Sequence, residues 1–238
     1  MHTSGPLRLK QVAKELAAQS TSSLAPKAAA ALTLGRYSAC APRALFVGAS
    51  TGGPQALAKF LGGLAPEIGA LPIFVVLHVP ADFTSIVTTN IARITGLEVR
   101  IGAHGEQVKP GKVYFAPGDM HMRVLRMGET PVIVHSNAAP ENFCKPAVDV
   151  LFRSAAQSFG PSALGIILTG MGADGLAGSH AIVEAGGAII AQDEATSVVW
   201  GMPGAVARSK LAAAVLPIDE IAGTVIGLTR GQRPGRAR

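Results

Sequence analysis

The sequence predicts an α/β domain built on parallel strands, with an antiparallel section in its middle. Short apolar runs alternate with helical patterns along residues 43–228, and short links between such elements favour parallel strands with right-handed crossovers. Glycine-rich turns directly follow two of the apolar runs. Hydrophobic residues make up 48% of the chain and charged residues only 15%, so the chain can bury a large core.

The first part of the domain alternates strand and helix. Apolar runs bounded by turn residues predict the strands, and apolar residues at helical spacing predict the helices. Pro54 fits the first turn of the first helix, where no backbone N–H is needed. The elements expected here are strands at 44–47, 73–79 and 98–101 and helices at 55–64 and about 83–95.

The middle of the chain departs from this alternation. Three short apolar runs, at 112–115, 122–126 and 131–135, are separated by turns rich in Gly, Pro and Asp. Residues 126–130 suit the link of a hairpin. We therefore expect the three runs to form an antiparallel section attached to the main sheet.

Alternation resumes after residue 145 and continues to the end of the domain. The expected helices are 146–159, 176–185, a segment from the loop 201–204 to about 208, and 218–228, with strands at 163–168, 188–191 and 213–216. The sequence thus divides into a tail or linker at 1–42, a folded domain at 43–228 and a basic tail at 229–238.

The net charge of +6 belongs to the tails and not to the domain. Residues 1–42 and residues 229–238 each carry +4, which leaves −2 for residues 43–228. A nucleic-acid-binding domain would concentrate positive charge on itself, and aromatic residues, at 5%, are too few for a base-stacking surface. We expect no nucleic-acid partner.

The remaining composition favours a cytoplasmic protein without membrane insertion. No apolar run approaches the length that spans a membrane. The two cysteines, Cys40 and Cys144, lie far apart and do not have the spacing of metal ligands. They are most simply interpreted as reduced thiols.

The stretch around Ser50 is the first candidate for chemistry. Gly48, Ser50 and Gly52 form the pattern G-x-S-x-G between the first strand and the first helix. Small neighbours let a serine project from a sharp turn, with free backbone N–H groups close by. Two alternatives stay open for this motif alone: a phosphate-binding loop at a helix N-terminus and a glycine turn with an idle serine.

Three polar residues follow the carboxyl ends of predicted strands: Ser50, His78 and Asp174. Active sites of open parallel sheets form at that edge. A hydroxyl becomes a nucleophile when an imidazole accepts its proton and a carboxylate orients the imidazole. The chain order serine, histidine, aspartate differs from that of α/β-hydrolases, so that fold is not predicted. Asp149, inside a predicted helix, is left as a salt-bridge candidate.

Five motifs in order give the chain a family resemblance. It resembles the catalytic domain of the chemotaxis protein-glutamate methylesterases, the CheB family, over about residues 43–228. The motifs are GASTGG at 48–53, LHVPADF at 77–83, APGDMHM at 116–122, KPAVDVLF at 145–152 and LTGMGADG at 168–175.

This resemblance implies a doubly wound, mostly parallel sheet with helices on both faces and an antiparallel hairpin at one edge. It implies a serine esterase that removes methyl groups from glutamate 5-methyl esters, and often deamidates glutamines, on the cytoplasmic helical methylation region of chemoreceptors. By motif match, Ser50 is the nucleophile, His78 the base and Asp174 the orienting carboxylate. The oxyanion hole falls at the backbone N–H groups of Thr51 and Met171. No cofactor and no metal are expected.

Two departures from the family pattern accompany the resemblance. Pro80 is followed by Ala81 where the family commonly has a second proline. The usual receiver domain is not expected in this chain, because no aspartate precedes Asp82 and only about forty residues precede the domain. Two other functions remain open: a nucleotide- or phosphate-binding module, and a non-enzymatic protein that docks on receptors.

Overall fold

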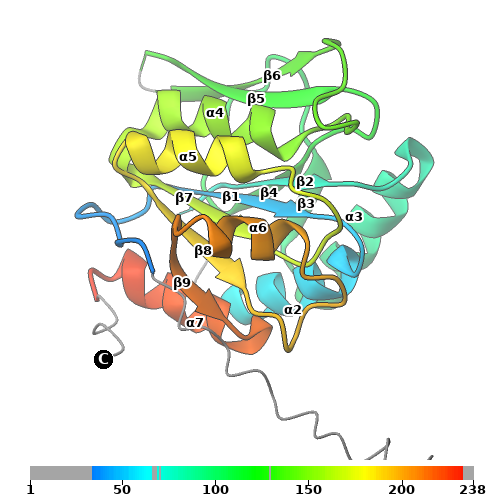
Figure 1. The fold of residues 1–238 in the computed structure, drawn as a ribbon. Helices are drawn as coiled ribbons and strands as arrows, with labels where there is room; N and C mark the ends of the chain where they lie inside the picture. The colour runs from blue at the N-terminus through cyan, green and yellow to red at the C-terminus, as the bar shows by residue number, and fades with distance from the viewer. Residues whose placement is uncertain (1–33, 66–68, 70, 129, 233–238) are drawn as a thin grey trace, which may run out of the picture. The chain divides into compact units, whose positions relative to one another are not determined.

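The computed structural model describes residues 34–65, 69, 71–128 and 130–232 (Figure 1). These residues belong to one compact unit, Thr33–Arg238. Of the tail or linker predicted at 1–42, residues 1–33 lie outside the described residues. Residues 233–238 of the predicted basic tail also lie outside them.

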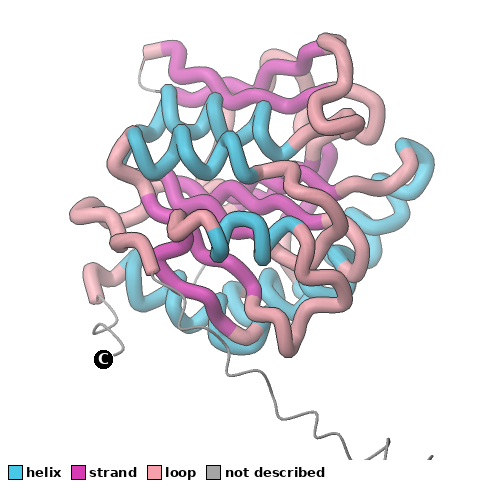
Figure 2. Tube along the Cα trace, in the orientation of Figure 1, coloured by secondary structure: helices cyan, strands magenta, loops and turns pink. Residues whose placement is uncertain are grey.

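The core of the domain is a sheet of seven parallel strands in the order β3-β4-β2-β1-β7-β8-β9. Figure 2 shows the strands in the interior with helices around them. The predicted α/β fold class is confirmed. The strands are β1 (Ala44–Ala49), β2 (Ile73–Leu77), β3 (Glu98–Ile101), β4 (Lys112–Phe115), β7 (Ala163–Ile167), β8 (Ala188–Gln192) and β9 (Ala212–Leu216).

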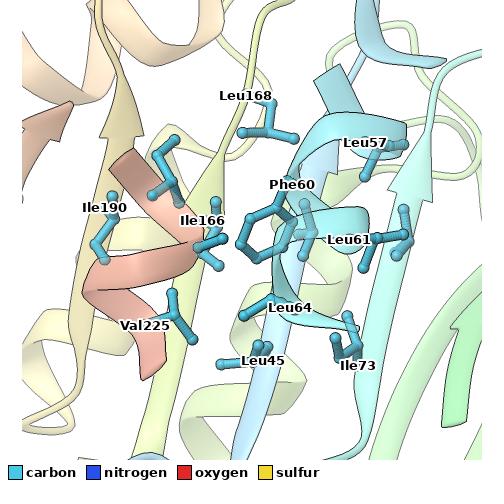
Figure 3. Close-up of a cluster of buried hydrophobic side chains, with 14 of the residues drawn as sticks. Leu45, Leu57, Phe60, Leu61, Leu64, Ile73, Ile166, Leu168, Ile190 and Val225 are labelled. Carbon is cyan, nitrogen blue, oxygen red and sulfur yellow. The ribbon is translucent and has the colours of Figure 1, made fainter. Parts of the chain in front are cut away.

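Helices cover both faces of this sheet, with α4 and α5 above it and α2 and α7 below it in Figure 1. Each face has its own apolar core. Figure 3 shows the lower one, where Phe60 of α2 and Val225 of α7 pack on Leu45, Ile166 and Ile190 of the strands. The helices are α2 (Gly53–Leu64), α3 (Ala81–Thr95), α4 (Val148–Phe159), α5 (Leu176–Glu184), α6 (Met202–Arg208) and α7 (Ile218–Thr229).

The expected antiparallel hairpin is present as β5 (His121–Met127) and β6 (Thr130–Ser136). It forms a two-stranded sheet of its own and packs on α4, instead of continuing the main sheet. Ser154 and Ser158 of α4 fix it there, since they bond the N–H and the carbonyl of Val124.

The prediction that residues 112–115 belong to the antiparallel section was wrong. They form β4, which lies between β2 and β3 and is parallel to both. Val113, Tyr114 and Phe115 are fully buried, as befits an inner strand covered on both faces. A four-residue apolar run bounded by turns looks the same in a parallel and in an antiparallel strand. The sequence pattern therefore did not distinguish the two kinds of pairing.

Residues 34–42 run along the domain surface. Gly35 N–H donates to the Ala212 carbonyl at 2.7 Å, and the Ser38 hydroxyl donates to the Pro161 carbonyl at 2.6 Å. Tyr37 packs against the lower core. No helix in the described part of the chain has the length and apolar character needed to cross a membrane.

The strand order places β1 at the point where the chain changes direction across the sheet. β1 pairs with β2 on one side and with β7 on the other. The loops that follow these three strands therefore meet at one edge, where ligands bind in open α/β sheets. Ser50, His78 and Asp174 lie in these three loops.

Candidate active site

Ser50 lies in a tight turn between β1 and α2 that backbone bonds hold on both sides. Its N–H donates to the Thr169 carbonyl at 3.0 Å, and its carbonyl accepts from Gly53 N–H at 2.7 Å. Gly52 caps α2 with a φ of 78°, a conformation that glycine adopts without strain. The serine is half-buried, and its position is set by the backbone of the turn.

The loop after β7 packs directly on this turn. A Cβ added to Gly170 would come 2.8 Å from Ser50 Cβ, so only glycine allows the two segments to approach this closely. The Thr169 hydroxyl donates to the Thr51 carbonyl at 2.9 Å and adds a second link. The two glycine-rich loops are therefore closely packed and hydrogen-bonded to each other.

His78 follows β2, beside Ser50. Its backbone N–H donates to the Ala49 carbonyl at 3.0 Å, which brings the backbones of residues 50 and 78 together. Its Nε2 lies 2.9 Å from Asp174 Oδ2. An ionised carboxylate only accepts hydrogen bonds, so Nε2 carries the proton and Nδ1 holds the free lone pair.

Asp174 is 2% exposed and accepts several hydrogen bonds. Besides His78, the N–H groups of Val148, Asp149 and Gly175 donate to it at 2.7, 3.0 and 2.9 Å. Burial alone would raise the pKa of Asp174, but the His78 bond and the N–H groups at the start of α4 outweigh it and lower that pKa. The carboxylate is thus held ionised against the imidazole.

Asp149 is a second buried carboxylate beside the first, and from the sequence we expected no role for it beyond an ion pair. It accepts from Gly178 N–H at 2.7 Å and from Asn142 Nδ2 at 2.8 Å. Asn142 Nδ2 also lies 3.4 Å from Asp174 Oδ1, so one amide joins the two acids. Burial, with the nearby charge of Asp174, raises the pKa of Asp149.

Cys144 lies against the other side of the His78 ring. Its Sγ is 3.7 Å from Nδ1 and 3.4 Å from the Asn142 carbonyl. The turn 141–144 is closed by two backbone bonds between Glu141 and Cys144, with positive φ at Asn142 and Phe143. Burial and the charges of Asp174 and Asp149 raise the pKa of the thiol.

Thr51 and Met171 face the same edge from the two glycine-rich loops, and both are exposed. Within the described residues, neither backbone N–H donates to a protein acceptor. The Ser50 hydroxyl likewise forms no hydrogen bond in the described part, with His78 or with another group. In ligand-free sites, catalytic hydrogen bonds are often long and tighten when substrate binds.

Other histidines and a nearby groove are not part of this cluster. His121 is buried and bonds Ala147 N–H and the Ala139 carbonyl, which holds the start of α4. His104 and His135 pack edge to face near the hairpin. A groove of about 640 Å³ between α2 and α3 is lined largely by apolar groups but includes none of the three polar residues.

A serine, a histidine and an aspartate gathered at the carboxyl edge of a sheet, with free N–H groups nearby, is an arrangement typical of serine hydrolases. The chain belongs to the CheB methylesterase family, because the model of that family matches residues 45–225. The resemblance noted in the sequence is thereby confirmed.

Relatives and a solved structure agree with this assignment. The chain is 48% identical over 204 residues to a "Protein-glutamate methylesterase/protein-glutamine glutaminase of group 2 operon" of Rhodopseudomonas palustris, covering 86% of this chain and 52% of the relative. It is 51% identical over 199 residues to a protein-glutamate methylesterase/protein-glutamine glutaminase of Nitrobacter winogradskyi, covering 84% and 47%. The chain spans about half the length of these relatives.

The fold matches the CheB methylesterase catalytic domain of Thermotoga maritima. The TM-score is 0.76 at 35% identity, and the match covers 79% of this chain and 100% of that one. Sequence and fold therefore point to the same family, over the region that carries Ser50, His78 and Asp174.

Proposed function

We propose that this domain is a serine esterase that hydrolyses glutamate 5-methyl esters, with deamidation of glutamines as a second reaction. The observation that carries the proposal is the His78–Asp174 hydrogen bond of 2.9 Å, formed next to the Ser50 turn. The names of the relatives describe the same two reactions.

In the proposed mechanism, Ser50 Oγ attacks the ester carbonyl carbon while His78 Nδ1 accepts the hydroxyl proton. The tetrahedral intermediate collapses, and the proton passes from His78 to the departing methoxide, which leaves as methanol. Water then attacks the acyl-enzyme by the same route and releases the glutamate and the free serine. Asp174 keeps Nε2 protonated and stabilises the imidazolium in both steps.

The oxyanion formed in each step needs hydrogen-bond donors that the protein does not already use. We assign this role to the backbone N–H groups of Thr51 and Met171, which lack acceptors among the described residues. The loss of one such donor costs about 10²–10³ in rate in other hydrolases. Rigid packing of the two loops favours this assignment, because preorganised donors stabilise charge without reorganisation.

We propose methyl-accepting chemoreceptors as substrates, at the helical methylation region in the cytoplasm. Family membership supports this choice, and both relatives are named for glutamate and glutamine side chains in proteins. A protein substrate also suits the open edge, where Met171, Phe143 and Val198 are exposed by 68%, 103% and 69%. Apolar groups there offer contact area for a helix.

The test is release of methanol from receptors carrying labelled methyl groups. The unmodified chain is expected to release it, and Ser50→Ala is expected to release none above background. Ser209→Ala is the matched control, because Ser209 is exposed at the end of α6 away from the site. Methanol release by Ser50→Ala at the rate of the unmodified chain would refute the proposal. A nucleotide that raises Tm would instead favour a phosphate-binding module.

A further inference from the structure

Cys144 has no part in the proposed ester hydrolysis, yet it lies beside the atom on which that reaction depends. Its Sγ is 3.7 Å from His78 Nδ1, the ring nitrogen that Asp174 leaves unprotonated. One ligand atom from each of His78, Cys144 and Asp174 lies within 4.8 Å of the others. In the described part of the chain, this is the one cluster of three such side chains with the geometry to hold a metal ion.

The separation of the two ligand atoms suits a tetrahedral ion. Zinc lies ~2.0 Å from imidazole nitrogen and ~2.3 Å from thiolate sulfur, so a tetrahedral angle separates the two ligands by about 3.5 Å. The observed 3.7 Å is close to that value without any movement of the backbone. Thiolate and imidazole together favour zinc over magnesium or calcium, which prefer oxygen.

Asp174 is arranged as the supporting group of such a site. Metal-bound histidines commonly donate their other ring N–H to a carboxylate, which fixes the ring and strengthens the ligand. His78 Nε2 already donates to Asp174 at 2.9 Å. The backbone N–H groups of Val148, Asp149 and Gly175 hold that carboxylate in place.

We propose that a thiophilic divalent cation, with Zn²⁺ as its representative, binds between His78 Nδ1 and Cys144 Sγ and reversibly inhibits the domain. Binding replaces the thiol proton of Cys144, which passes to solvent, and no electron is transferred. The inhibition rests on the proposed esterase function, because the ion occupies the lone pair that would accept the Ser50 proton. The binding itself does not depend on that function.

Direct binding is measured with Co²⁺ as the probe, because a cobalt–thiolate bond gives a charge-transfer absorption band. The unmodified chain and Cys40→Ser are expected to give this band at one equivalent of Co²⁺, and Zn²⁺ is expected to displace it. Cys144→Ser is expected to lose the band and to bind Zn²⁺ at least about tenfold more weakly, because even the loss of a group that only supports a metal ligand costs about that much affinity. Cys40 is the matched control, an exposed thiol outside the cluster. An unchanged band in Cys144→Ser would overturn the proposal.

A second measurement uses the unmodified sequence, so its result does not depend on how a variant folds. In the unmodified chain, iodoacetamide labelling of Cys144 and Cys40 is followed by mass spectrometry with and without Zn²⁺. Zn²⁺ is expected to slow the labelling of Cys144 at least about tenfold and to leave Cys40 unchanged, because a metal-bound thiolate is shielded. Equal labelling of Cys144 in both conditions would contradict binding at this site.

Inhibition is measured as the ratio of methanol release without and with Zn²⁺, each variant being compared with itself. We expect a ratio of at least about ten for the unmodified chain and about one for Cys144→Ser, since zinc then lacks its sulfur ligand. Measuring Zn²⁺ binding to Ser50→Ala tests the metal site independently of the esterase proposal. If Ser50→Ala binds Zn²⁺ while no chain releases methanol, the esterase proposal fails and the metal site stands. If the unmodified chain releases methanol, but Zn²⁺ changes neither the labelling of Cys144 nor the rate of methanol release, only the proposed metal site is refuted.

Discussion

The two halves of the site are held in different ways. Ser50 is placed by backbone, through a left-handed glycine, a bond to the Thr169 carbonyl and the close approach of Gly170. His78 is placed by side chains, through Asp174 and the network of Asn142 and Asp149 behind it. The position of the nucleophile in this site therefore depends on local turn geometry, whereas the position of its base depends on contacts between distant segments.

The largest effect on the rate is expected at His78, because this side chain links Ser50 to Asp174. In His78→Ala no group accepts the Ser50 proton, so the rate of methanol release should fall by about 10⁶, as in other serine hydrolases. Tm should also fall, because the buried Asp174 carboxylate loses one of its hydrogen-bond donors. The check is initial rates with labelled receptors. His180→Ala is the control, an exposed histidine on α5. If His78→Ala kept most of the activity, no proton would pass through this ring.

Asp174→Asn probes the side-chain half and is expected to rank second. An amide cannot hold the imidazole in the required tautomer, which cost about 10⁴ in kcat in another triad. The N–H groups of Val148, Asp149 and Gly175 also lose a charged acceptor, so the free energy of unfolding should fall by about 1–3 kcal/mol. Rates and urea unfolding measure the two effects. A rate within tenfold of the unmodified chain would exclude the orienting role.

Gly170→Ala probes the backbone half without removing a polar group. The new Cβ would lie 2.8 Å from Ser50 Cβ, so the two loops must separate. A displacement of about 1 Å at a reacting atom can cost about 10² in rate, and we expect a loss of that size. Gly223→Ala is the control, because open space surrounds that position on α7. Equal rates in the two variants would show that Ser50 tolerates movement.

Much of the Ser50 turn was predictable from sequence, whereas little of the side-chain network around His78 was. Gly48, Ser50 and Gly52 lie within five residues, and a strand before them and a helix after them suffice to define the turn. Asn142, Cys144 and Asp149 gave no comparable signal, because their roles arise from contacts with residues 29–66 positions away. The orientation of β4 was missed for the same reason, since pairing partners are not visible in a four-residue run.

Asn142→Ala tests the side-chain network behind His78, and we expect a smaller loss of activity than in the variants above. Its amide donates to Asp149 and lies between the two acids, so its loss increases their mutual repulsion. We expect about a tenfold lower rate and a loss of about 1–2 kcal/mol in stability, the usual cost of unpairing a buried group. Asn137→Ala, at an exposed position with one lysine contact, is the control. An unchanged rate would mean that Asn142 only shapes the turn.

The smallest expected effect is the pH dependence of stability. The pKa of Asp174 is lower in the folded chain than in the unfolded one, so its stabilisation is present above the unfolded pKa, ~4, and is lost as pH falls through the folded pKa. The Tm difference between the unmodified chain and Asp174→Asn should therefore shrink from pH 7 towards acid. A difference that stays constant down to the lowest pH at which both fold would contradict a lowered pKa.

The proposed mechanism requires that Ser50 is a nucleophile activated by His78 and Asp174. The most direct measurement is reaction with a fluorophosphonate, followed by peptide mapping of the modified residue. We expect a single modification at Ser50, at a rate that falls sharply in His78→Ala and is unaffected in His180→Ala. Modification of a different residue, or labelling of Ser50 at the same rate in His78→Ala, would contradict it.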